Sequence, residues 1–127
     1  MIDALFNHPN HLAAKQLLDV TVLRHEAIAG NLANLETPNY KRLDVSKDFE
    51  QQLQESISTG NVRRLNAMQP RISVDESAVA ARRDGNTVDL EKELVHMSRN
   101  GVEHAVETHL ITGRLLKLRL AITGRAA

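Results

Sequence analysis

The feature that most constrains the fold of this 127-residue chain is a run of mostly apolar residues near each end. Within each run, the residues are spaced alternately by four and three positions. The first run comprises Ala14, Leu18, Thr21, His25, Ile28, Leu32 and Leu35. The second comprises Leu90, Leu94, Met97, Gly101, His104, Thr108, Ile111, Leu115, Leu118 and Ile122. This spacing aligns side chains on one face of an α-helix and is typical of long helices that pack along their lengths. We therefore predict one helix over 11–36 and a second over 88–123.

The fold class that follows is mainly α. The two terminal helices are expected to pair as an antiparallel, coiled-coil-like hairpin, because the segment 37–87 is long enough for the chain to turn back. We expect 1–127 to form a single domain, in which 37–87 supplies a turn, a short helix and an extended middle segment.

Both runs turn polar near their centres, at Thr21 and His25 in the first and at His104 and Thr108 in the second. Either these polar patches meet and set the register of the two helices, or each faces solvent or a neighbouring subunit. Val22 lies off the first run, so that helix is apolar on more than one side. The extra apolar side chains indicate either a second packing surface or scattered exposed residues, which are common.

A proline ends the first helix. Pro38 has no N–H group and disfavours helical backbone at Thr37, so the helix should stop by about residue 35 or 36. Pro38 and Asn39 suit the central positions of a type II turn, because asparagine tolerates the positive φ required at the second. Asn34 is expected to bond carbonyls or amides at the helix end. Asn31, one turn earlier, lies on nearly the same face.

The middle of the chain carries weaker signals. Residues 43–59 contain the signal of a shorter helix, which Ser46 can cap and Gly60 can close. Residues 60–87 read as irregular or extended, with one short strand over 70–75.

Smaller signals mark a turn and the helix starts. We predict a weak helix over 78–83 and a turn over 84–86. Asn10 is a candidate cap for the first long helix, and Asn86 or Thr87 for the second.

Composition excludes several functions. The 16 basic and 16 acidic residues balance, which argues against nucleic-acid or polybasic membrane binding. The absence of cysteine excludes disulfides and thiolate metal sites. No apolar run is long enough to span a bilayer. Because no cleavable signal peptide is visible, any export has to use another route.

No motif predicts catalysis. The six histidines lack the spacing of converging metal ligands, and no nucleophile elbow or phosphate loop is present. The carboxylates Glu91 and Glu93, and likewise Glu103 and Glu107, are interpreted as solvated helix faces. We expect no enzyme activity, no cofactor and no metal.

Two stretches carry a family resemblance. Asn31-Leu-Ala-Asn34-Leu-Glu-Thr37-Pro38-Asn39-Tyr40-Lys41 resembles the N-terminal signature of the bacterial flagellar axial proteins, which include rod and hook proteins. Asn39 replaces the usual glycine there. Asp84-Gly-Asn-Thr-Val-Asp-Leu-Glu-Lys-Glu93, with the helix after it, is similar to the C-terminal part of the proximal-rod member. The resemblance covers about 11–60 and 84–123.

The resemblance implies a structural subunit of the proximal rod of the flagellar basal body, in the periplasmic space. Such a subunit would be exported by the flagellar type III apparatus without a cleaved signal, assemble helically, transmit torque and form part of the export channel. Its implied partners are other copies of itself, other rod proteins, an adapter protein of the FliE type, and the export gate and MS ring. Another rod subunit, or a cytosolic helical-hairpin adaptor or export chaperone, remains an alternative.

The residues expected to form the structural motif and the subunit interface fall into two groups. The turn group is Asn31, Asn34, Thr37, Pro38, Asn39 and Tyr40. The helix group is Leu18, Ile28, Leu32, Leu94, Ile111, Leu115 and Leu118.

Overall fold

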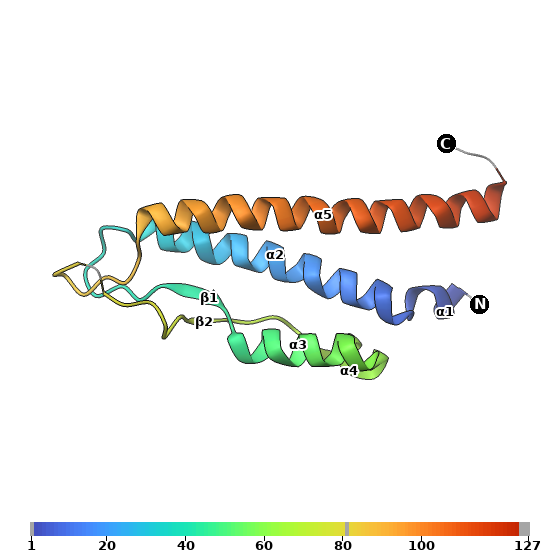
Figure 1. Ribbon diagram of the computed structural model, residues 1–127, viewed down its shortest axis with the longest axis horizontal. Helices are drawn as coiled ribbons and strands as arrows, with labels where there is room; N and C mark the ends of the chain where they lie inside the picture. Colours follow the sequence, from blue (N-terminus) through green and yellow to red (C-terminus); the bar gives the residue numbers. More distant parts are fainter. Residues whose placement is uncertain (1, 81, 125–127) are drawn as a thin grey trace.

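The computed structural model describes residues 2–80 and 82–124. Two long helices, α2 (Pro9–Ala33) and α5 (Leu90–Thr123), lie side by side and run in opposite directions (Figure 1). The predicted mainly helical fold with an antiparallel terminal pair is thus confirmed. A short helix, α1 (Ile2–Phe6), precedes α2. The connecting loops lie at one end of the pair, and the chain termini lie toward the other (Figure 1).

A second layer covers another side of α2. It contains the strands β1 (Leu43–Val45) and β2 (Ile72–Val74) and the helices α3 (Lys47–Thr59) and α4 (Val62–Ala67). The strands pair antiparallel, with Asp44 opposite Ser73. We call β1, α3, α4 and β2 together the middle layer. In Figure 1 it lies on the far side of α2 from α5.

The starts of the long helices differ from those predicted. The residue before α2 is His8, whose Nδ1 accepts the Asn10 N–H at 3.3 Å, and Pro9 occupies the first turn, where its missing N–H costs nothing. Asn10 is therefore inside the helix and does not cap it. The cap of α5 is Asp89, whose carboxylate accepts the N–H groups of the two residues after Leu90. Neither Asn86 nor Thr87 caps α5.

The helix ends follow the sequence more closely. The helix α2 ends at Ala33, a little before the proline turn. Gly60 closes α3 and Gly124 closes α5, each with the positive φ that glycine adopts at little cost. Ser46 stands at the start of α3 as predicted, but its side chain forms no capping hydrogen bond.

Two predictions for the middle were wrong. Helix α4 was read as irregular chain, because six residues show too little periodicity; tertiary contacts fix it instead. Gln16 of α2 donates to the carbonyls of Leu65 and Met68 at 2.8 and 3.0 Å, and the Leu65 side chain is fully buried. The weak helix over 78–83 does not form in the described residues 78–80 and 82–83; Ala81 lies outside them. The short strand within 70–75 is confirmed as β2.

The hydrophobic core lies between α2 and the middle layer. Its buried members are Leu12, Val20, Val45, Phe49, Leu53 and Leu65. The helix α5 contributes none of them: its buried residues, in the part of it that is described, are Glu93 and Asn100. The contact between the two long helices is therefore more polar than the mostly apolar residues at four-and-three spacing suggest.

The polar patches of the two helices meet at one point. Thr21 Oγ1 lies 3.0 Å from His104 Nδ1, and Asn100 donates to the Thr21 carbonyl at 2.8 Å. Because the Thr21 hydroxyl donates its proton to the Leu18 carbonyl at 2.7 Å, His104 Nδ1 acts as the donor toward Thr21. The two polar patches therefore meet through Thr21 and His104, whereas His25 and Thr108 are exposed.

Within residues 2–80 and 82–124, none of the helices combines the length and the apolar character that crossing a bilayer requires.

Candidate structural joint

Asn31 fastens the returning chain to α2. Its side chain is fully buried; the amide donates to the Leu43 carbonyl at 2.8 Å and its oxygen accepts the Leu43 N–H at 2.9 Å. The same amide lies 3.2 Å from a carboxylate oxygen of Glu93 on α5. Asn31 therefore pairs with β1 as a neighbouring strand would, and fixes where β1 crosses the helix. We call the segments 31–44 and 84–93 the joint.

The turn predicted after α2 is present. The Tyr40 N–H points to the Thr37 carbonyl at 3.4 Å, and Asn39 has φ of 59°, as a type II turn with Pro38 at its first central position requires. Asn34 closes the helix end, since its amide donates to the Gly30 carbonyl at 2.8 Å. Its oxygen accepts the Thr37 hydroxyl at 3.2 Å.

Asn86 was missed as part of this site, because its position before a helix suggested a cap. Its side chain is fully buried, and its amide lies 2.9–3.1 Å from the carbonyls of Asn34, Leu35 and Thr37. These carbonyls belong to the residues that directly follow the end of α2. Asn86 therefore ties the segment before α5 to the end of α2.

The loop before Asn86 also requires a glycine. Gly85 has φ of 78°, and an added Cβ there would lie 2.5 Å from Asn39 Oδ1. The Asn39 N–H donates to the Asp84 carbonyl at 2.9 Å. The two family-like stretches of the sequence thus pack directly against each other.

A buried ion pair lies at the centre of the joint. The Arg42 guanidinium donates to the carboxylate of Glu93, which is fully buried, and also to Asp44 at 3.0 Å and Asp75 at 2.8 Å. The Arg42 N–H donates to the Thr87 hydroxyl at 2.8 Å. One arginine therefore connects β1, the residue after β2 and the first turns of α5. The interpretation of Glu93 as part of a solvated face was wrong, because Arg42 and Asn31 satisfy its carboxylate inside the protein.

The electrostatics favour the charged state of these groups. Burial by itself would raise the pKa of Asp44, but the hydrogen bond from Arg42 and the charges of two arginines outweigh burial and lower it. The pKa of Asp75 is lowered for similar reasons, with Ser77 as the main donor. Burial would lower the pKa of Arg42, yet the bonds to Glu93 and Asp44 leave it raised.

A second arginine joins the helices to the middle layer. Arg24 of α2 forms ion pairs with Asp44 at 3.2 Å, with Glu50 of α3, and with Glu103 of α5 at 3.5 Å. Asp44 thus lies between two arginines. No sequence motif singled out Arg24 or Arg42.

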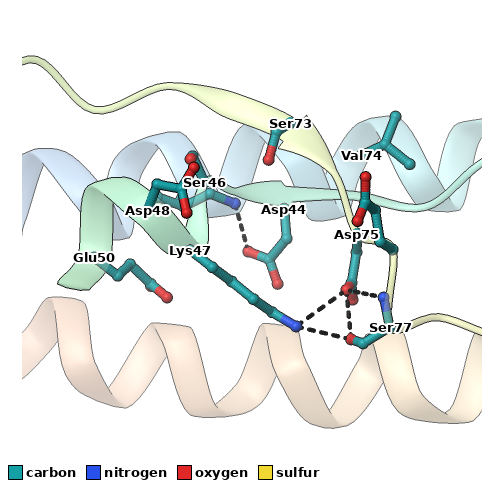
Figure 2. Close-up of a pocket in the computed structure, with 11 residues that line it drawn as sticks. Asp44, Ser46, Lys47, Asp48, Glu50, Ser73, Val74, Asp75 and Ser77 are labelled. Atoms are coloured by element: carbon teal, nitrogen blue, oxygen red, sulfur yellow. Dashed lines mark hydrogen bonds and ion pairs between the residues drawn. The ribbon is translucent and has the colours of Figure 1, made fainter.

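A groove beside the joint is lined by polar side chains, some of which bond one another. Figure 2 shows Lys47 reaching across it to Ser77 at 3.0 Å and to Asp75 at 3.6 Å. Asp48 and Glu50 line the same groove. Among the described residues, no three histidine or acidic side chains are placed to hold a metal ion.

The residues of the helix group, which were predicted to form the subunit interface, differ in how far they are buried. Ile28 is buried, while Leu18, Leu32, Ile111 and Leu118 are partly buried. Leu94 and Leu115 each remain 46% exposed. That these side chains contact other subunits stays a prediction.

The fold and the joint together define a helical hairpin whose buried charges hold separate chain segments together. No protein-family model matches the chain. It is 32% identical over 114 residues to the flagellar basal body rod protein FlgB of Aquifex aeolicus (strain VF5), covering 88% of this chain and 91% of that protein. It is 30% identical to FlgB of Borrelia hermsii, over 76% of this chain and 83% of that protein. It is 27% identical to FlgB of Bacillus subtilis (strain 168), over 80% of this chain and 84% of that protein.

The chain belongs to the FlgB family of flagellar basal body rod proteins. It is a structural component of the rod and not an enzyme, as the sequence resemblance implied.

Replacing Glu93 with glutamine should destabilise the fold. The change keeps the shape but removes the charge that faces the buried Arg42, so we expect the free energy of unfolding to fall by about 2–3 kcal/mol. Urea unfolding followed by circular dichroism measures this. The matched control is Glu91→Gln on the exposed face of the same helix, expected to change stability by less than about 0.5 kcal/mol. Equal effects of the two variants would contradict the buried pair.

Stability should fall on acidification. The pKa values of Asp44 and Asp75 are lower in the folded chain than the usual 3.8, so the unfolded chain takes up protons first. Their contribution is complete well above pH 3.8 and is lost as the pH falls below that value toward the lowered pKa values.

The check is urea unfolding between about pH 6 and pH 3, for the native chain and for Asp44→Asn/Asp75→Asn. The variant should lose less stability over that range than the native chain. An unchanged pH dependence in the variant would show that these two carboxylates do not carry the effect.

Proposed function

We propose that this chain is a subunit of the proximal rod that assembles helically, transmits torque and forms part of the wall of the export channel. The observation that carries the proposal is the exposed apolar surface of α5. Val95, Val102 and Val106 are 51–66% exposed, and Leu116, Leu120 and Ile122 are 46–74% exposed. Large apolar side chains that stay exposed in this number along one helix favour a contact with other proteins.

The division of the chain supports the proposed placement. The core lies on one side of α2, so the middle layer is anchored there and α5 is left open to neighbours. We propose that the paired helices form the inner wall and that the middle layer reaches outward. The joint holds this outward segment at a fixed angle through Asn31, Asn86 and Arg42.

The proposed partners are copies of this chain, other rod proteins, an adapter of the FliE type, and the export gate and MS ring. Torque then passes through many helix contacts, none of which has to be strong by itself. We propose that the chain acts as one unit over 1–127 and is exported without a cleaved signal.

The test is complementation of a strain that lacks this gene, scored by isolated basal bodies and by motility. The native chain should restore rods, whereas Asn86→Ala should restore fewer, because it removes the hydrogen bonds that tie the segment before α5 to the turn after α2, at a cost of about 1–3 kcal/mol. The control is Asn66→Ala, an exposed asparagine whose side chain is bonded weakly, at 3.4 Å.

Circular dichroism of each purified variant separates loss of fold from loss of assembly. Normal rods in the strain without the gene, with only the order of export changed, would contradict the proposal and favour an export chaperone.

A further inference from the structure

The two edges of the small sheet differ in what covers them. At the edge of β1 that faces away from β2, the N–H and the carbonyl of Leu43 bond to the Asn31 side chain, so α2 covers this edge. Among residues 2–80 and 82–124, no strand pairs with the other edge of β2. We call this side of Ile72–Val74 the open edge.

The register of the strands shows which backbone groups lie at the open edge. The Asp75 N–H donates to the Arg42 carbonyl at 2.8 Å, which makes these two residues a hydrogen-bonded pair. Bonded and non-bonded pairs alternate along antiparallel strands, so the backbone groups of Ile72 and Val74 point away from β1. Within the described part of the chain, these groups have no hydrogen-bond partner. Unpaired groups of this kind are a template for a further strand.

The side chains of β2 indicate what such a strand would bury. Ile72 and Val74 lie on the same face of the sheet as Val45, which belongs to the hydrophobic core. They nevertheless remain 38% and 49% exposed. A strand added beside β2 would cover them with apolar side chains of its own, and every second side chain of that strand would lie on the opposite face, beside Ser73.

The opposite face borders the groove of Figure 2, which is acidic. Its lining includes one basic residue, Lys47, and the carboxylates of Asp44, Asp48, Glu50, Asp75 and Glu76. Ion pairs with Arg24, Arg42 and Lys47 use three of these carboxylates. Asp48 and Glu76 form no ion pair with any residue that the structure describes. The groove therefore favours basic side chains on the strand that lies beside it.

We infer that the open edge of β2 binds an extended segment of a different protein, in which apolar and basic residues alternate. The main-chain bonds supply the attachment, and the two sets of side chains supply the specificity. The inference adds a partner to the proposed assembly and rests on that proposed function.

A second copy of this chain fits the open edge poorly. Its strands read Leu43-Asp44-Val45 and Ile72-Ser73-Val74, so they carry an acidic or a neutral residue where the groove favours a basic one. Two β2 strands that paired with each other would also form a self-complementary contact. Such a contact closes as a dimer and does not continue along a rod.

Cross-linking from β2 tests the inference, because the chain has no native cysteine. Ser73→Cys, at an exposed position of β2, is treated with a short thiol-reactive diazirine in basal bodies from a strain that makes only the variant. After irradiation, mass spectrometry locates the attachment. The adduct should join one different protein, within a segment in which apolar and basic residues alternate. The control Ser58→Cys, exposed at the far end of α3, should not give this adduct.

A proline at the open edge separates strand addition from simple proximity. Val74→Pro, combined with Ser73→Cys, removes an N–H that bonds nothing within the described chain, and proline is tolerated at such an edge. The adduct should be lost. Val74→Thr keeps both the N–H and the branched shape and should retain the adduct. Circular dichroism and urea unfolding of the purified variants check that the fold is kept.

The charge of the groove provides a second test, which decides the matter if the proline variant does not fold. Asp48→Asn/Glu76→Gln removes the two unpaired carboxylates and should lower the yield of the Ser73→Cys adduct by about threefold or more. The matched control is Asp19→Asn/Glu26→Gln, which removes two exposed carboxylates of α2 and should leave the yield unchanged.

Four results would overturn the inference. The first is an adduct between two copies of this chain, which would favour pairing between β2 strands. The others are no adduct from Ser73→Cys although the chain is present in the basal bodies, attachment to a segment without the alternation, and an adduct that survives in a folded Val74→Pro chain or is unaffected by the loss of charge. Absence of the folded chain from basal bodies would instead contradict the proposed function.

Discussion

The buried pair of Arg42 and Glu93 is the interaction on which the rest of the structure depends. Removing two charges from water is costly and is tolerated only when other hydrogen bonds satisfy them. Here the Arg42 guanidinium also donates to Asp44 and Asp75, and the Glu93 carboxylate also accepts a hydrogen bond from Asn31. These groups come from four segments of the chain, so the pair forms only when the end of α2, both strands and the start of α5 are in place. The same bonds therefore set the angle at which the chain leaves the helices.

This arrangement separates the sources of stability from the surface left for assembly. The aliphatic core around Phe49 and Leu65 lies between α2 and the middle layer. The long helix α5 is held mainly by polar contacts, at Glu93, Asn100 and His104. Most of its large apolar side chains thus stay exposed in the folded chain. Under the function proposed above, the fold and the assembly of the rod depend on different residues.

The sequence predicts the two long helices and the turn well, because heptad spacing and Pro38 act locally. It predicts the joint poorly, because Glu93 and Asn86 acquire their roles from segments about 50 residues away, by hydrogen bonds with no local pattern. One signal was available: Arg24 and Asn31 are seven residues apart, a spacing that places them on the same face. Polar residues repeated at this spacing on a buried face indicate a partner layer that is polar too.

A double-mutant cycle between Arg42 and Glu93 tests this account most directly. The free energy of unfolding is measured for Arg42→Met, for Glu93→Leu and for the double variant. If the two groups pair inside the joint, the double variant should lose less stability than the sum of the single losses, by more than about 1 kcal/mol. Losses that add to within about 0.5 kcal/mol would show that the two residues act independently, and the joint would then lack the interaction at its centre.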